Sequence, residues 1–333
     1  METLTYSFNA VVPLLLLIAL GYFLKRCGKW SGKFFSELNN FCYRVLLPIQ
    51  LFYNVYGIGK LGELNWRVLG YAIAWIPLSI LLGAALAALL IKDSRQKGAF
   101  VQASFRSNQA IMGLPLAISL GGAAAAPIAS LATSIGIPLF NISAVLILTL
   151  YGKSESEGGR LKQILKSLVT NPLIIGVVCG IVCVAIRYLI PEENGVPVFT
   201  IQNQLTPIYT AIKNLSAVAS PVMLICLGAS LNFSFSKELL AKISAGVLMR
   251  LVLMPCAAIG GAILLRTQLG LTTAEMPMLV AFFGSPVAVS SVIMVREMGG
   301  DEQYAGQLVV WSSVLSMLSL FAIIAVLRSL CFL

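Results

Sequence analysis

The stretch Gly113-Leu114-Pro115-Leu116-Ala117-Ile118-Ser119 occurs a second time in the chain as Gly284-Ser285-Pro286-Val287-Ala288-Val289-Ser290. Both copies read Gly-x-Pro-aliphatic-Ala-aliphatic-Ser, and each lies inside a long apolar run. A proline inside a helix removes one hydrogen bond and clashes with the carbonyl four residues earlier, which costs about 3 kcal/mol or more. The preceding glycine lowers the resistance of the helix to unwinding. The pattern predicts that two helices break at these points, although membrane helices also tolerate proline as a simple kink.

The composition places these apolar runs in a membrane. The chain of 333 residues is 58% hydrophobic and 11% charged, with a mean hydropathy of +0.91, whereas soluble domains carry about 25% charged residues. About 20 apolar residues cross a bilayer as a helix, the element that satisfies its own backbone in lipid. We count ten such runs, at 7–24, 34–56, 66–91, 98–120, 123–151, 168–190, 205–231, 240–264, 274–296 and 303–330. The predicted fold class is an all-α polytopic membrane protein with ten transmembrane helices.

Two further pairs of prolines extend the internal repeat. Pro48 in the second span matches Pro221 in the seventh, and Pro77 in the third span matches Pro255 in the eighth. Five spans separate the members of each pair, and because five is odd, the two halves must have opposite orientations. Inverted repeats with broken helices in matching positions are typical of secondary transporters. We therefore expect a first five-helix repeat over 1–151, a short cytoplasmic loop over 152–167 and a second five-helix repeat over 168–333.

The basic residues predict the orientation. Fourteen of the 23 lysines and arginines fall in the loops on one side and five in the loops on the other, with Arg44, Arg106, Lys213 and Arg250 inside spans. Cytoplasmic loops carry the excess of basic residues. Both termini are therefore expected outside, and the loop 152–167 in the cytoplasm, for a protein of the cell (inner) membrane.

Several classes of function are disfavoured. The absence of histidine removes imidazole bases and most catalytic zinc sites. Cys179 and Cys183 lie one helical turn apart, but buried cysteine usually acts as a small apolar residue. All 13 acidic residues fall in loops or near span ends, so no paired aspartates lie at the midplane. We expect no enzyme, no cofactor, no metal and no nucleic-acid partner. The expected partners are an organic anion, the lipid bilayer and, as an open alternative, a second copy of the chain.

The predicted breaks indicate an anion site. Each break should leave backbone amides without helical partners, near 116–117 and 287–288, at the positive end of a half-helix. Two such ends directed at one point bind anions. Arg250 is predicted about 15 Å into its span, where it balances substrate charge or caps loose carbonyls. The alternatives are a purely structural bond to backbone and an extension of the side chain to an interface. Arg106, Lys213 and Arg44 are expected to extend toward a membrane interface.

Three stretches carry a family resemblance. They are Ala103-Ser104-Phe105-Arg106-Ser107-Asn108-Gln109-Ala110-Ile111-Met112-Gly113-Leu114-Pro115, then Gly284-Ser285-Pro286 followed by Val295-Arg296-Glu297, and Leu46-Leu47-Pro48. With them the whole chain resembles the auxin efflux carrier family of membrane transporters. The resemblance implies a ten-helix fold related to bile-acid symporters and sodium/proton antiporters. It implies a scaffold from helices 1, 2, 6 and 7, and a transport domain from helices 3–5 and 8–10 in which the broken helices 4 and 9 cross. The short central loop is similar to that of bacterial members associated with small organic acids.

The resemblance also implies a role for Asn108. In the family motif the matching asparagine contacts the substrate at the crossing, while the structural alternative is an amide that bridges two helices. The second repeat has Leu279 at the equivalent distance from its proline, so the site is not symmetric. The full set of candidate substrate-binding residues is Gln50, Asn108, Gln109, Gly113, Pro115, Leu116, Arg250, Ser285, Pro286 and Val287.

These features together favour one function. We expect a secondary transporter of small organic anions, either carboxylates such as malate and malonate or auxin-like acids, that works by alternating access. A sodium-coupled symporter of larger amphipathic anions is the alternative, because backbone carbonyls can also bind sodium.

Overall fold

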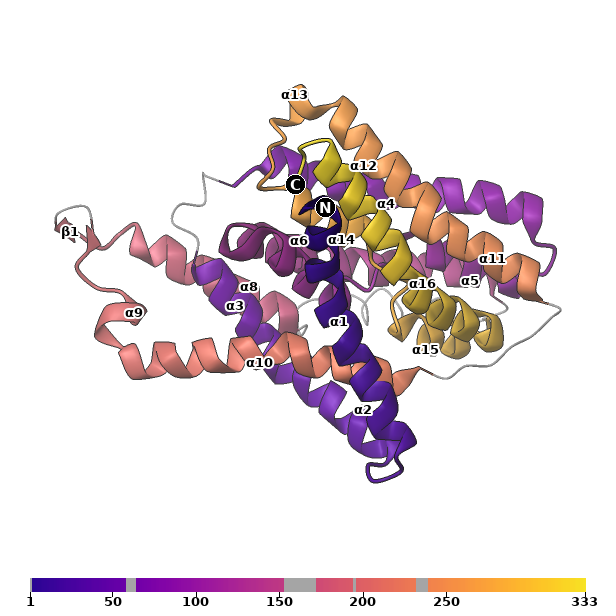
Figure 1. The fold of residues 1–333 in the computed structure, drawn as a ribbon, viewed down its shortest axis with the longest axis horizontal. Helices are drawn as coiled ribbons and strands as arrows, with labels where there is room; N and C mark the ends of the chain where they lie inside the picture. Colours follow the sequence, from indigo (N-terminus) through magenta and orange to yellow (C-terminus); the bar gives the residue numbers. More distant parts are fainter. Residues whose placement is uncertain (1, 58–63, 153–171, 194–195, 232–238) are drawn as a thin grey trace.

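The computed structural model describes residues 2–57, 64–152, 172–193, 196–231 and 239–333, and nearly all of their regular structure is helical (Figure 1). Most of the predicted loop 152–167 lies outside the described residues. The first half of the chain contains α1 (Glu2–Arg26), α2 (Gly32–Phe41), η1 (Cys42–Leu46), α3 (Leu47–Tyr56), α4 (Trp66–Leu90), α5 (Ser94–Phe105), η3 (Gln109–Gly113) and α6 (Leu114–Tyr151). The second half contains α8 (Pro172–Arg187), the short strands β1 (Glu192–Glu193) and β2 (Val196–Pro197), α9 (Ile201–Gln204), α10 (Thr206–Ser230), α11 (Leu240–Leu248), η5 (Met249–Leu253), α12 (Met254–Leu264), α13 (Arg266–Leu269), α14 (Met276–Gly284), α15 (Ser290–Glu297) and α16 (Glu302–Ser329).

Six of the described helical stretches are long and apolar enough to cross a membrane. They are Thr5–Arg26, Trp66–Leu90, Gln109–Tyr151, Thr206–Ser230, Leu240–Leu264 and Glu302–Ser329. Large apolar side chains such as Leu81, Leu89 and Leu189 are exposed on the surface, where only lipid would cover them without cost. These features confirm a helical polytopic membrane protein. The count of ten spans and the inverted repeat stay predictions.

The longest helix, α6, contains a sharp turn near its start. Gly122 has a φ of 59° and interrupts the helical backbone, a conformation that glycine adopts without steric penalty. The turn falls between the predicted spans 98–120 and 123–151. The chain therefore reverses there with almost no loop.

Three π-helical turns each precede an X-Pro pair. The turns η1, η3 and η5 end directly before Leu47-Pro48, Leu114-Pro115 and Met254-Pro255. Proline has no N–H for the regular helical bond and clashes with a carbonyl one turn back. A local π-turn shifts that carbonyl away and lets the helix continue. Pro115 therefore sits in a continuous helix, and the break predicted at Gly113–Pro115 is wrong.

The helical breaks lie at two other points along the chain. In the first half the helix ends at Phe105 and resumes at Gln109, one to two turns before the predicted position. In the second half α14 ends at Gly284 and α15 starts at Ser290, so the break predicted at Gly284–Pro286 is confirmed. Ser285, with φ −66° and ψ 147°, has the extended conformation that a following proline favours.

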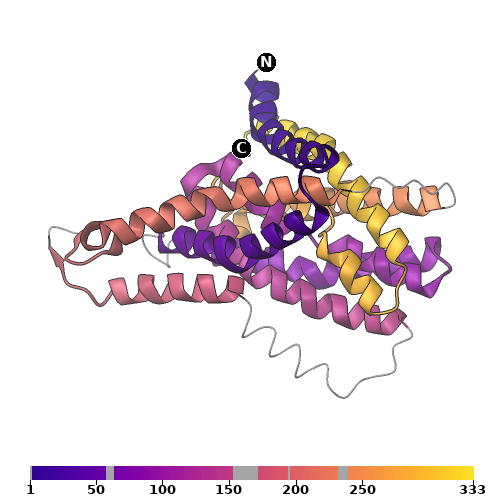
Figure 2. The same ribbon diagram turned by 90° about the horizontal axis from the view of Figure 1, so that it is seen from below.

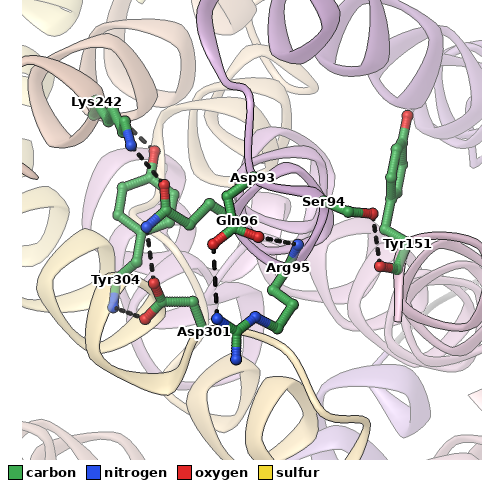
Figure 3. A network of polar contacts seen from close by, with 8 residues as sticks. All are labelled: Asp93, Ser94, Arg95, Gln96, Tyr151, Lys242, Asp301 and Tyr304. Carbon is green, nitrogen blue, oxygen red and sulfur yellow. Dashed lines mark hydrogen bonds and ion pairs between the residues drawn. The ribbon is translucent and has the colours of Figure 1, made fainter. Parts of the chain in front are cut away.

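Hydrogen bonds join one group of helix ends (Figure 3). Gln96 at the start of α5 donates to Asp301 Oδ2 at 2.9 Å and accepts a bond from Lys242 Nζ of α11 at 2.7 Å. Ser94 Oγ donates to the carbonyl of Tyr151, the last residue of α6, at 2.8 Å. The starts of α5, α11 and α16 and the end of α6 thus form one connected group.

A second group of helix ends is joined in the same way. Asn65 Nδ2, before α4, donates to the carbonyls of Leu269 and Gly270 at 3.0 and 2.9 Å. Tyr6 OH in α1 donates to the carbonyl of Leu120 at 2.9 Å, and its ring lies 4.6 Å from the guanidinium carbon of Arg328. The two termini accordingly lie close together in both views (Figure 1 and Figure 2).

The helix pair α1 and α10 makes the closest backbone approach. A Cβ added at Gly228 would overlap the carbonyl oxygen of Ile18, and one added at Gly21 would overlap the carbonyl oxygen of Ile225. The reciprocal contact lets the two helices pack with their backbones touching, as small residues allow in membranes. Gly176 of α8 contacts the backbone of Pro48 in α3 in the same manner.

Candidate functional site

The two breaks pair with each other. Asn108 N donates to the carbonyl of Pro286 at 2.8 Å, and Ala288 N donates to the carbonyl of Arg106 at 3.0 Å. Ser107 and Val287 form an antiparallel bridge between these bonds. The extended segments 106–108 and 285–288 therefore satisfy part of each other's backbone, which is the condition for irregular backbone inside a membrane protein. Helix ends from distant parts of the chain meet at this crossing.

Arg250 holds the carbonyl ends of the broken helices. Its guanidinium is 2% exposed and donates to the carbonyls of Ser104 at 3.2 Å, Phe282 at 3.3 Å and Ser285 at 2.9 Å. These carbonyls lie at the C-termini of α5 and α14, where each helix carries about half a negative charge. One cation therefore balances two helix ends, which matches the capping role among those predicted for Arg250.

A cavity of about 480 Å³ opens beside the crossing. The first break contributes Arg106, Ser107, Asn108 and Gln109, and the second contributes Ala288, Val289 and Ser290. On the side of the crossing α6 adds Ile137, Phe140 and Asn141. The facing wall comes from other helices, and its members include Phe35, Ser36, Asn39 and Tyr43 of α2 and η1, and Met223, Cys226 and Leu227 of α10. The volume lies in the range typical of sites for small ligands. Apolar and polar groups share its wall.

Three consecutive side chains at the first break have polar atoms without a protein partner. Ser107 Oγ, Asn108 Nδ2 and both amide atoms of Gln109 are buried and make no hydrogen bond to the described residues. The residues are 4%, 4% and 0% exposed, respectively. A buried polar group without a partner costs about 1–3 kcal/mol. Their concentration on the cavity wall is what a site for a polar ligand requires.

Arg106 is buried in the same wall. It is 6% exposed, and its Nη2 donates to Asn141 Oδ1 at 2.8 Å and to Ser290 Oγ at 3.0 Å, while Nη1 contacts the sulfur of Met294. The prediction that Arg106 extends to an interface is wrong. Lys213 and Arg44, by contrast, are exposed, as expected.

The positive ends of the resumed helices also reach the cavity. Gln109, Ala110 and Ile111 begin the helix after the first break, and Val289 and Ser290 begin the helix after the second. The first amides of a helix have no intrahelical partner and carry partial positive charge. The sequence predicted such amides near 116–117 and 287–288. The first position is wrong because the break lies earlier, before the π-turn.

The predicted site residues divide into two groups. Asn108 and Gln109 line the cavity, whereas the other candidates lie outside its wall. Those are Gln50, Gly113, Pro115, Leu116, Arg250, Ser285, Pro286 and Val287. Pro286 and Val287 support the crossing through their backbones, Ser285 Oγ donates to the carbonyl of Ala281 at 2.6 Å, and Gln50 Nε2 donates to Ser220 Oγ at 2.8 Å between α3 and α10.

The polar residues of the facing wall were not among the predicted site residues. Ser36, Asn39 and Tyr43 follow one another at spacings of three and four residues, which places them on one face of a helix. That polar stripe in an apolar span was the available signal. Asn141 has no comparable sequence pattern, because it becomes significant only through its bond to Arg106.

Comparisons with known proteins agree on the class of protein. Residues 6–324 match the family described as membrane transport protein. An uncharacterized transporter of Methanothermobacter thermautotrophicus is 24% identical over 322 residues, which cover 94% of this chain and 96% of the relative. An uncharacterized transporter of Methanocaldococcus jannaschii is 25% identical over 230 residues, or 67% and 68% of the two chains. The resemblance seen in the sequence is thereby confirmed, and the chain is a transporter, not an enzyme. It belongs to the membrane transport protein family, that of the auxin efflux carriers.

Proposed function

We propose that the protein is a secondary transporter of small organic anions, and that its substrate binds in the cavity beside the crossing. The observation that carries this proposal is the run of unpartnered buried polar atoms on Ser107, Asn108 and Gln109. They lie where two helix N-termini face the same space. Amide donors and positive helix ends suit a carboxylate better than a cation or a neutral apolar molecule.

The position of the cavity supports an alternating-access mechanism. One wall belongs to α2, η1 and α10, and the other belongs to the crossing and α6. Both α2 and η1 pack against α10, which in turn packs against α1. The first set falls in the scaffold that the family resemblance implies, and the second in the transport domain. A shift of one set against the other would open the cavity toward alternate sides while Asn108 keeps its contact with the substrate.

The two groups of bonded helix ends support ten spans with both termini on one side. The turn at 26–32, the starts of α5, α11 and α16 and the end of α6 would lie in the cytoplasm, where the basic residues gather. The termini, Leu120 and the loops around Asn65 and Leu269 would lie outside. Tyr6, bonded to Leu120 and stacked under Arg328, belongs to this outer group.

Flux into proteoliposomes tests the proposed function. The purified chain is reconstituted and supplied with labelled malonate, malate, lactate and phenylacetate, with membrane potential, pH gradient and sodium gradient imposed separately. Saturable uptake of at least one carboxylate, absent from empty liposomes, is the expected result. Uptake only under a sodium gradient, and only of the larger phenylacetate, would favour the sodium-coupled symporter instead. No uptake of any carboxylate would overturn the proposal.

A further inference from the structure

We propose that Arg106 binds the anionic group of the substrate and thereby sets the preference of the site for acids over neutral analogues. This inference rests on the proposed function, since it assigns the charge recognition within the same cavity. It concerns a residue that the family resemblance did not single out.

The first argument is the burial of a cation without an acid. Arg106 is 6% exposed, and the partners described for it are an amide oxygen, a hydroxyl and a thioether, all neutral. Ion pairs among the described residues are confined to exposed side chains, such as Lys33 with Glu37 and Arg296 with Glu302. A buried charge inside a membrane protein is costly unless it is paired, and it marks a functional site by default. The cavity beside Arg106 is where its counter-ion can enter.

The second argument is the geometry of its donors. A guanidinium has five N–H donors in a planar fork, so it can bind several acceptors at the same time. The Nη2 group is held by Asn141 and Ser290, which fix its orientation from α6 and α15. Nη1 meets only the sulfur of Met294, a weak acceptor. A carboxylate oxygen is a far stronger acceptor and can take that position.

The third argument is the charge of the cavity wall. Among the described residues that line it, the charged ones are Arg106 and Lys25, and none is acidic. Lys25 is half-buried in the last turn of α1, on the wall opposite the crossing, and it adds to the positive field that attracts an anion. Arg250 is also buried nearby, but three backbone carbonyls already occupy its donors. Of the cations near the cavity, Arg106 is therefore the one that lies at the crossing itself, next to Ser107, Asn108 and Gln109.

The test compares acids with their amides. Binding of malonate and malonamate, and of lactate and lactamide, is measured by titration calorimetry on the purified full chain and on Arg106→Gln, Arg106→Lys and Arg44→Gln. Loss of a hydrogen bond to a charged group should weaken acid binding about 10- to 100-fold in Arg106→Gln, with little change for the amides. Arg106→Lys should retain an intermediate affinity because it keeps the charge but not the fork. Arg44, exposed and bonded to Asn40, serves as the control arginine and should leave binding unchanged.

Each outcome separates the two proposals. If Arg106→Gln is monodisperse in detergent and still prefers acids to amides as strongly as the parent, the assignment of Arg106 is wrong while the transport proposal stands. If Arg106→Gln does not fold, the acid preference of Arg106→Lys decides. A preference weaker than that of the parent supports the assignment, and a preference equal to that of the parent overturns it. If the unaltered chain binds none of the acids, the proposed function fails together with this assignment.

Discussion

At the scale of single residues, Asn108 and Arg250 take part in the crossing in different ways. Asn108 is held there by its backbone, and Arg250 contributes its side chain. Asn108 uses its N–H on Pro286 and its carbonyl on Met112 and Gly113, so its position is fixed without help from the side chain. Its side-chain Nδ2 is then left without a partner among the described residues, beside the cavity that Asn108 lines. Arg250 does the opposite, because its guanidinium donates hydrogen bonds to three backbone carbonyls at two helix ends. Asn108 is therefore suited to bind a ligand, whereas Arg250 is suited to stabilise the broken helices.

We predict that Asn108→Ala weakens carboxylate binding while the protein stays folded. One unsatisfied buried partner costs about 1–3 kcal/mol, or about 5- to 150-fold in affinity. Calorimetric titration of the variant gives the comparison. Ser119→Ala is the control, since Ser119 bonds to the carbonyl of Ala10 at 3.3 Å and lies outside the cavity wall. Equal affinities of Asn108→Ala and the parent would contradict the placement of the substrate at the crossing.

For Arg250 we predict a loss of stability that lysine partly repairs. Arg250→Ala leaves three carbonyls at two helix ends without their donor, for a cost of about 3 kcal/mol or more. This should lower the unfolding temperature in detergent by about 5–10 °C. Arg250→Lys keeps a charge near the same helix ends. Its unfolding temperature should therefore lie between those of Arg250→Ala and the unaltered protein. Identical melting curves for all three proteins would show that Arg250 is only tolerated at its position.

At the scale of elements, the repeated Gly-x-Pro motif shows what a sequence pattern can predict. Both prolines disturb a helix, as expected, but they do so differently. Pro286 lies in an extended break, while Pro115 follows a π-turn in a continuous helix. The break of the first half lies at Arg106–Asn108, where it is stabilised by bonds to residues 286 and 288. Because those partners are remote in sequence, no local pattern could locate it.

The apolar pattern predicted other elements well. The gap between the spans 98–120 and 123–151 coincides with the turn at Gly122. Asn108 and Gln109, taken from the family resemblance and the apolar context, line the cavity. The polar stripe of Ser36, Asn39 and Tyr43 is visible in the sequence, but its position opposite the crossing is not, because that wall forms only when α2 and α10 pack beside the crossing. Long-range packing, rather than local propensity, decides which polar residues share the cavity.

The contact between α1 and α10 yields a prediction with a matched control. A Cβ at Gly228 would overlap the backbone of Ile18, so Gly228→Ala must push the two helices apart. A Cβ at Gly70, in the second turn of α4, would meet nothing within 4 Å, and alanine there removes the helical penalty of glycine, about 1 kcal/mol. Gly228→Ala should lower the melting temperature in detergent and Gly70→Ala should leave it equal or higher. The reverse order would contradict the close backbone packing.

At the scale of the whole molecule, the arrangement of helix ends can be compared with the orientation in the membrane that the basic residues predict. The turn at 26–32 follows the basic last turn of α1, and it belongs to the side where Lys and Arg concentrate. The C-terminus lies on the opposite side, with Arg328 near Tyr6 of α1. An even number of crossings is required for both termini to share a side. Native cysteines at these two places, Cys27 and Cys331, allow the orientation to be determined without introducing new cysteines.

We predict that Cys331 reacts with a membrane-impermeant maleimide added to intact cells and that Cys27 does not. Both thiols are exposed, and each is tested alone after the other six cysteines are replaced by alanine. After the membrane is permeabilised, Cys27 should react as well, which controls for its accessibility. Labelling of Cys27 but not Cys331 in intact cells would reverse the orientation. Labelling of both would mean that an even number of spans separates Cys27 from Cys331, whereas ten spans place nine between them, and the ten-span proposal would fall.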